Sequence, residues 1–355
     1  MVGRTRGAIA SGLVLVALTF MTLQGLLFYR PLPAIDGYYR FLGLDQQAEV
    51  VRDAFGIPRI EAGTLHDLFF LQGYVTAQDR FAQMQALRSS DEVHRIIDLS
   101  APLDEPLATA LDAYAEGVTK YIDQHAEHRA LPAGITLRGE RPTPWTPRDS
   151  VAIATRYRAA PPASPCRVVD GVRALRDAPM LAAELTTTAP EPGWYEIGLG
   201  APGLRGLGIS LPGVPGLIAG HNGHVAWSVS GSDIRAAVGA LQAATIADVD
   251  SGDQGCAVDD RGGLTGAGAD GEAFDVEALR VRFGTAQGGS SARIVIDLGD
   301  LDASRAALST GQSGHPAALH YRDQAQLWSA GQLHRLAWTP GAIARTEGRL
   351  VLRPR

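Results

Sequence analysis

The residues best suited to chemistry lie near the middle of the chain, in the stretch Ala163-Ser164-Pro165-Cys166-Arg167. A serine hydroxyl is a weak nucleophile until a neighbouring base takes its proton. Pro165 has no backbone N–H and fixes its own φ, and it biases Ser164 away from the helical region. From these residues alone, Ser164 is either a candidate nucleophile or an ordinary loop serine.

The chain has two cysteines, Cys166 and Cys256. They fit an oxidising compartment in which they pair. Two cysteines without a spacing motif do not decide between a disulfide and two free or buried thiols, so both alternatives stay open. The sequence contains no group of Cys and His at metal-ligand spacing, and we expect neither a metal nor a cofactor.

The composition indicates a packed globular protein of one or two domains, with 355 residues, 45% of them apolar and 20% charged. The net charge of −6 is spread along the chain. It provides no basic surface of the kind that binds nucleic acid, so we exclude that function.

The N-terminus carries a targeting signal. Arg4 and Arg6 precede an uncharged, mostly apolar run over residues 7–29, and Arg30 follows it. Such a run is long enough to cross a bilayer and longer than the apolar region of about 7–15 residues in a cleaved signal peptide. We therefore favour a transmembrane signal anchor over residues 1–30, with a cleaved peptide as the alternative. The charge distribution predicts a membrane-anchored, extracytoplasmic protein with the membrane as a partner.

Local patterns predict several elements. Extended segments at 49–53 and 59–62 flank a Gly/Pro turn and indicate a hairpin or a strand bend. Thr64, with Asp67 three positions on, is typical of a helix cap, and the helix is expected to reach Met84.

Three further segments have a clear character. Apolar side chains at helical spacing over residues 107–122 predict a second helix. The alternation over residues 224–230 predicts a strand, whereas the Gly- and Asp-rich residues 248–271 indicate a loop or linker.

Longer motifs carry a family resemblance. They resemble the penicillin acylase (penicillin amidase) family, in the family's order, and they cover most of the chain after the N-terminal segment. The motifs are Val51-Arg52-Asp53, Gly56-Ile57-Pro58, Asp67-Leu68, Gly73-Tyr74-Val75-Thr76-Ala77-Gln78-Asp79-Arg80, Gln83-Met84, Pro144-Trp145-Thr146-Pro147-Arg148-Asp149-Ser150, Trp194-Tyr195-Glu196, Leu211-Pro212-Gly213-Val214-Pro215-Gly216, Gly220-His221-Asn222, Ala226-Trp227, Gly311-Gln312-Ser313-Gly314, His320-Tyr321, Asp323-Gln324 and Trp328.

The resemblance implies an α+β fold, the αββα sandwich of N-terminal-nucleophile hydrolases, here truncated and preceded by one N-terminal transmembrane helix. It also implies an exported precursor that cuts itself before a serine. The freed serine attacks an amide, and its own α-amino group acts as the base. An α-amino group has a pKa of about 7.7–8.0, which suits that task near neutral pH.

The resemblance also assigns the site. The family's second subunit begins Ser-Asn-x-Trp, which corresponds here to Ser164-Pro165-Cys166-Arg167, so Ser164 is the expected catalytic nucleophile. The backbone N–H of Gly231 is the expected oxyanion donor. The family's Asp-Pro-His segment corresponds to Ala182-Ala183-Glu184-Leu185. Many members hold calcium with aspartates that are absent around residues 235–238, and Asp233 alone cannot supply the ligands calcium needs.

The resemblance also implies that His221 and Asn222 are mainly structural residues of a strand and a turn.

By the same resemblance the chain divides into five parts. The five parts are the anchor (1–30), a region like the first subunit (31–158), a region like the start of the second (159–247), a Gly-rich linker where the family has a longer middle block (248–275), and a region like the C-terminal part of the second subunit (276–355).

Two functions remain open from the sequence. The first is a hydrolase of linear amide bonds that processes itself before Ser164 and acts on small acyl amides, such as β-lactam side chains or acyl-homoserine lactones. The second is a catalytically inactive, membrane-anchored relative with a binding or structural role, or a decaying gene.

Overall fold

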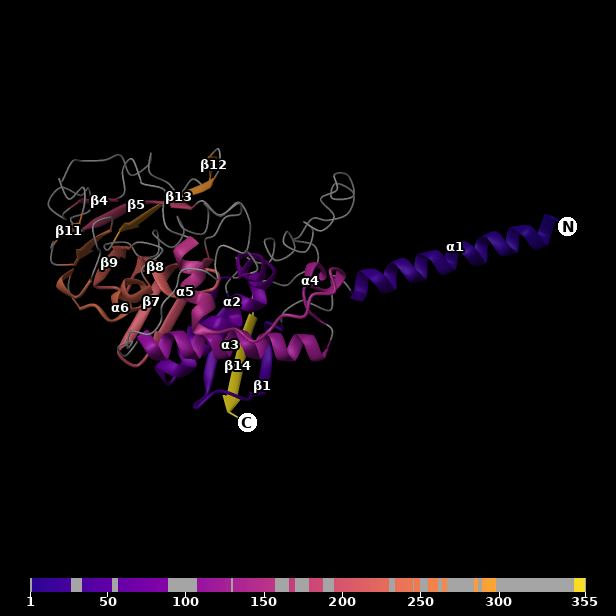
Figure 1. Ribbon diagram of the computed structural model, residues 1–355, viewed down its shortest axis with the longest axis horizontal. Coiled ribbons are helices and arrows are strands. Elements are labelled where there is room, and N and C mark those ends of the chain that lie inside the picture. The colour runs from indigo at the N-terminus through magenta and orange to yellow at the C-terminus, as the bar shows by residue number, and fades with distance from the viewer. Residues whose placement is uncertain are drawn as a thin grey trace.

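Two β-sheets and a layer of helices make up the computed structural model of the chain (Figure 1). The residues that it describes are 2–26, 34–52, 57–88, 107–128, 130–156, 166–169, 179–187, 195–229, 234–244, 246–249, 255–260, 264–266, 284–286, 289–297 and 348–354. The α+β class predicted from the sequence is confirmed.

The larger sheet has ten described strands in the order β1-β14-β2-β3-β6-β7-β8-β9-β10-β11. The last strand of the chain lies between β1 and β2, parallel to β1 and antiparallel to β2. The bounds are β1 (Gly37–Phe41), β2 (Ala48–Arg52), β3 (Pro58–Glu61), β6 (Tyr195–Ala201), β7 (Leu204–Leu211), β8 (Val214–His221), β9 (Val225–Ser228), β10 (Cys256–Asp259), β11 (Leu264–Gly266) and β14 (Gly348–Pro354).

The smaller sheet has four described strands in the order β12-β13-β5-β4, each antiparallel to its neighbour. Its strands contact β9, β10 and β11 of the larger sheet, so the two sheets pack against each other. The bounds are β4 (Cys166–Val169), β5 (Met180–Thr187), β12 (Gly284–Ala286) and β13 (Gly289–Asp297).

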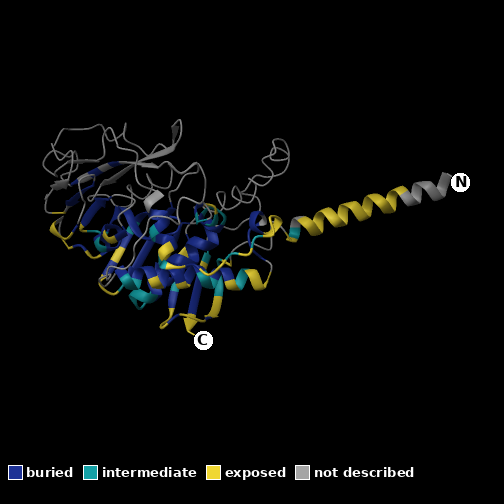
Figure 2. Ribbon diagram, in the orientation of Figure 1, coloured by how far each residue is buried: buried dark blue, intermediate teal, exposed yellow. Residues whose placement is uncertain are grey.

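The helical layer is built on two long helices, α2 (Leu65–Arg88) and α3 (Leu107–Glu127). They cross where two glycines allow close approach, because a Cβ on Gly73 would lie 2.2 Å from the Tyr114 carbonyl oxygen and one on Gly117 would lie 1.8 Å from that of Phe70. Figure 2 shows that these helices and the strands beneath them are largely buried. The shorter elements are α4 (Ala133–Leu137), α5 (Pro147–Arg156), α6 (Ile234–Gly239), η2 (Ala240–Gln242) and η3 (Ile246–Asp248).

The N-terminal helix α1 (Val2–Gln24) lies away from the sheets in Figure 1, and its apolar side chains are exposed. The predicted transmembrane run covered residues 7–29, of which 27–29 lie outside the described residues, and α1 carries Thr19 and Thr22 in its last turns. Within the described part of the chain, no helix is long and apolar enough to span a bilayer. The predicted transmembrane helix is therefore not supported.

Most of the local predictions are confirmed. Strands β2 and β3 pair as an antiparallel hairpin, and the predicted strand over 224–230 is β9. The Thr64 hydroxyl accepts the Asp67 backbone N–H at 3.0 Å, so Thr64 caps α2 as expected. The Gly-rich region 248–275 differs from the expected linker, because β10 and β11 within it extend the larger sheet.

A buried ion pair joins the helical layer to the sheet. The Arg52 guanidinium donates to both carboxylate oxygens of Asp79, at 2.7 and 3.1 Å, and the Tyr195 hydroxyl donates to the same carboxylate at 2.5 Å. Burial, followed by the Asp79 carboxylate, raises the pKa of Tyr195 well above its ordinary value, so this phenol remains a donor. Burial lowers the pKa of Arg52, but Asp79 and Tyr195 reverse this and leave it raised.

We predict that Asp79→Asn will lower the free energy of unfolding by about 3–5 kcal/mol, because it removes the carboxylate that pairs with a buried guanidinium. Urea denaturation measures the change. The control is Glu49→Gln, which breaks an exposed ion pair with Arg349 and should have a much smaller effect. Equal losses in the two variants would show that the buried pair is not special.

Candidate active site

The two residues expected to catalyse, Ser164 and Gly231, lie outside the described residues, and so does Asp233. The strands beside them are described. Strand β4 begins at Cys166, two residues after Ser164, and β9 ends at Ser228, three residues before Gly231. These strands belong to different sheets. In the sequence, Ser164 precedes a strand of the smaller sheet, and Gly231 follows a strand of the larger one.

A disulfide connects these layers. Cys256, the first residue of β10, is disulfide-bonded, and Cys166 is the only other cysteine of the chain. Strands β4 and β10 also contact each other. The bond therefore links Cys166 to Cys256, decides the alternative that the sequence left open, and fastens the start of β4 to the larger sheet.

The register of the larger sheet shows which side chains share the face of this disulfide. Cys256 is paired with Ser228, and Ser228 with Ala219. Cross-strand partners point to the same face, and so does His221, two residues along β8 from Ala219. Because Cys256 bonds to β4, this face is the one that the smaller sheet covers. Ser228 and His221 are thus buried polar side chains between the two sheets.

His221 is the unusual member of this face. Its side chain is 7% exposed, and neither ring nitrogen has a hydrogen bond within the described part of the structure. Burial lowers the pKa of His221 to about 4, so the imidazole is neutral at pH 7. The sequence resemblance implied a structural residue, and no spacing signal in the sequence indicated that the ring lacks a partner.

Asn222 is structural, as implied. Its Oδ1 accepts the backbone N–H groups of His224 and Val225 at 3.0 and 2.9 Å, and its Nδ2 donates to the Ala243 carbonyl at 2.6 Å. The side chain therefore holds the turn between β8 and β9. The residues at the family's Asp-Pro-His position, 182–185, lie in β5.

Other family-like motifs hold the β7–β8 hairpin against the helices. The Gln72 amide on α2 pairs with the Gly216 backbone, donating to its carbonyl and accepting its N–H, both at 3.1 Å. The Tyr114 hydroxyl on α3 accepts the Gly213 N–H at 3.0 Å. Gly213 and Gly216 have φ of 96° and 88°, a conformation that favours glycine. The motif residues Gly213 and Gly216 therefore maintain the architecture.

The Trp145 motif anchors the start of α5 in the same way. The Trp145 indole N–H donates to the Ser150 hydroxyl at 3.0 Å. Arg88, at the end of α2, pairs with Asp149 at 3.1 Å and lies 5.2 Å from the centre of the Trp145 ring. The motif thus joins α5 to α2.

The sequence model of the family described as penicillin amidase matches residues 47–91, 89–161, 161–237 and 230–345, nearly the whole chain after its N-terminal segment. The chain belongs to the penicillin amidase family. The match includes the segments before and after Ser164, and it confirms the resemblance seen in the sequence.

Individual relatives cover much less. An acyl-homoserine lactone acylase of Pseudomonas putida is 30% identical over 216 residues, which are 53% of this chain and 26% of that protein. A penicillin acylase 2 proenzyme of Pseudomonas sp. is 29% identical over 148 residues, 35% of this chain and 19% of that protein. A thermostable penicillin G acylase from Alcaligenes faecalis is a solved structure with 25% identity and a TM-score of 0.28, covering 31% of this chain and 71% of that one. The chain spans about a quarter of the length of the Pseudomonas putida enzyme.

We predict that reducing the disulfide will lower the free energy of unfolding by about 2–4 kcal/mol, because the unfolded chain loses a long closed loop. Denaturation with and without reductant measures this. Cys256→Ser should show the same loss and no further response to reductant. Alkylation of both thiols in unreduced, unfolded wild-type protein would contradict the bond.

We also predict that the stability of the protein rises with pH between about 4 and 6.5. In this window the unfolded His221 binds a proton, whereas the folded one, with its pKa lowered to about 4 from 6.5, does not. Stability from this group is complete above 6.5, and at most about 3 kcal/mol is lost by pH 4. His221→Phe should flatten the slope in urea titrations, and His224→Gln, an exposed control, should leave it unchanged.

Proposed function

We propose that the chain is a hydrolase of linear amide bonds in small acyl amides, with Ser164 as a nucleophile freed by self-cleavage of the 163–164 peptide bond. Family membership supports the reaction class, and relatives are named as acylases of acyl-homoserine lactones and penicillin. The observation that carries the proposal is the position of β4, which starts two residues after Ser164 and is fastened to the opposing sheet.

Cleavage would supply the missing base. Hydrolysis of the bond before Ser164 frees its α-amino group, whose pKa of about 7.7–8.0 allows it to take the hydroxyl proton near neutral pH. The hydroxyl oxygen attacks the amide carbonyl, and the proton passes to the departing amine. Water then hydrolyses the ester, which releases the carboxylic acid and restores the serine.

The oxyanion of each tetrahedral intermediate needs hydrogen-bond donors, each worth about 10²–10³ in rate. Pro165 has no N–H and contributes none. We assign one donor to the Gly231 backbone, which follows β9 by three residues. This role needs only a backbone N–H, so it does not depend on the aspartates that the chain lacks at residues 235–238.

The disulfide has a specific consequence for a freed N-terminus. New chain ends fray unless they are held. Two residues span at most about 7 Å, so a serine two positions before Cys166 stays within that distance of a covalently fixed Cα. We infer that the bond limits the movement of the nucleophile after cleavage. The serine then loses less conformational entropy when it takes up the geometry of the reaction.

We propose an extracytoplasmic location for the protein. The disulfide supports it, because such bonds form and persist in oxidising compartments.

We predict that the purified protein consists of two fragments, the second beginning at Ser164, and that it hydrolyses phenylacetyl or longer acyl amides. Ser164→Ala should remain one chain without activity, because it lacks the attacking oxygen. Ser164→Cys is the matched control, which keeps a nucleophile and should still be cleaved. Intact mass and N-terminal sequencing measure the cleavage. An uncut wild-type chain that hydrolyses none of these amides would refute the proposal.

A further inference from the structure

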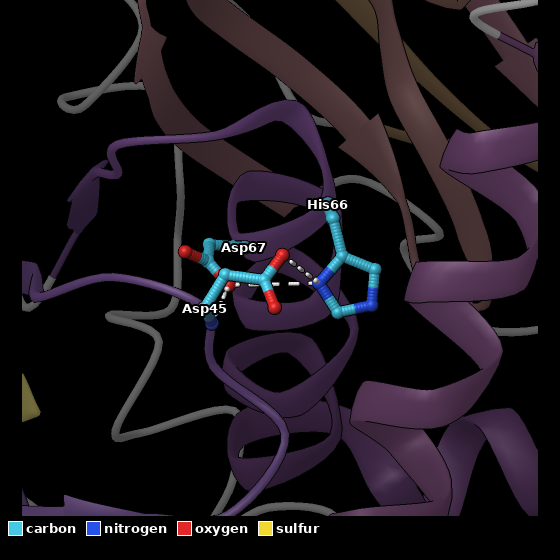
Figure 3. Close-up of side chains that lie close together, drawn as sticks. All are labelled: Asp45, His66 and Asp67. Atoms are coloured by element: carbon cyan, nitrogen blue, oxygen red, sulfur yellow. Dashed lines mark hydrogen bonds and ion pairs between the residues drawn. The ribbon is translucent and has the colours of Figure 1, made fainter. Parts of the chain in front are cut away.

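A mixed group of nitrogen and oxygen donors lies at the start of α2, away from the residues of the proposed reaction (Figure 3). It consists of Asp45, in the segment between β1 and β2, and of His66 and Asp67 on α2. The His66 Nδ1 atom is 3.8 Å from Asp45 Oδ2 and 3.5 Å from Asp67 Oδ1. All three donor atoms lie within 4.8 Å of one another.

The orientation of His66 aims one nitrogen into this group. Its Nε2 is 3.3 Å from the Glu116 carboxylate on α3, a distance at which Nε2–H donates. The Nδ1 lone pair then faces two carboxylates, and this buried atom has no hydrogen bond among the described residues. Histidines that bind metals usually donate their other ring N–H to a carboxylate in this way.

Asp67 is held as rigidly as a ligand needs to be. Its side chain is fully buried, and its two oxygens accept the backbone N–H groups of Asp45 and Gln46 at 2.8 and 2.9 Å. A carboxylate has about four lone-pair positions, so these bonds leave capacity for a cation. The same bonds keep the backbone of Asp45 beside α2, while the Asp45 side chain is 66% exposed and free to adjust.

We propose that Asp45, His66 and Asp67 bind a divalent transition-metal ion of the zinc class, with water completing its coordination. Zinc bonds to histidine nitrogen and carboxylate oxygen are about 2.0–2.2 Å long, which separates neighbouring tetrahedral ligands by about 3.4 Å. The observed 3.5 and 3.8 Å are close to this spacing. An imidazole nitrogen suits zinc, cobalt or nickel, whereas calcium and magnesium prefer oxygen ligands alone.

The competing explanation is a protonated His66 that forms ion pairs with the three surrounding carboxylates and binds no metal. The two explanations differ in one measurable way. A metal site takes up one ion per chain and is stabilised by it, because a ligand that binds only the folded state raises the free energy of unfolding. An ion pair does neither.

The test uses the full, untagged chain after removal of metals with a chelator. We expect calorimetry with zinc to show saturable binding of one ion, and cobalt to give the absorption bands of a low-coordinate site. Asp45→Asn should weaken zinc binding at least about tenfold, and Glu116→Gln about 10–100-fold. Zinc should raise the melting temperature of the wild type but not of Asp45→Asn.

Two controls separate this site from general surface binding. Asp260→Asn alters an exposed His–Asp pair, His224 and Asp260 at 3.2 Å, that has one carboxylate, and zinc affinity should not change. Circular dichroism verifies the folding of each variant. The absence of saturable zinc binding, equal affinity in Asp45→Asn and the wild type, or equal affinity for calcium would overturn the proposal. None of these outcomes depends on Ser164 or on hydrolysis.

Discussion

The buried contact of Arg52, Asp79 and Tyr195 is the interaction on which the architecture depends. It joins β2, α2 and β6, which are distant in sequence, at a point with almost no access to water. A buried ion pair adds little to stability compared with apolar side chains of the same size, because both charges lose hydration. Its value here is geometric. A bidentate pair with a third donor fixes the height and rotation of α2 over the sheet, which apolar packing alone specifies less sharply.

Helix α2 carries several such contacts along its length. Gln72 binds the backbone of β8 at Gly216, Asp79 pairs with Arg52 of β2, and Arg88 joins α5 through Asp149 and Trp145. Within the long sequence motif on this helix, Asp79 is therefore explained by the ion pair and Gly73 by the close approach of α3. Resemblance in these residues is strong evidence for the family's framework, and evidence for the chemistry has to come from residues 163–167 and 231.

The sequence predicted what depends on local rules. Thr64 as a cap, the β2–β3 hairpin, α2, α3 and β9 all follow from side chains that are near in sequence. Features that arise from distant pairing were not predictable. Strand β14 lies between β1 and β2, although almost the whole sequence separates it from them. Strand β10 is four residues long and lies within a Gly- and Asp-rich stretch that has no periodicity. The disulfide and the Asp45–His66–Asp67 group depend on the same long-range arrangement, so spacing could not indicate them.

The arrangement also explains how the two sheets are held together. Among the described residues, the two sheets contact each other through β9, β10 and β11 of the larger sheet and β4 and β5 of the smaller one. A covalent bond at one end of that contact, between β4 and β10, adds a fixed link to this packing. Because the bond starts at Cys166, it ties the strand that follows Ser164 in the sequence to the larger sheet. The disulfide and the proposed nucleophile are therefore only two residues apart in the sequence, so the link between the sheets begins beside the proposed chemistry.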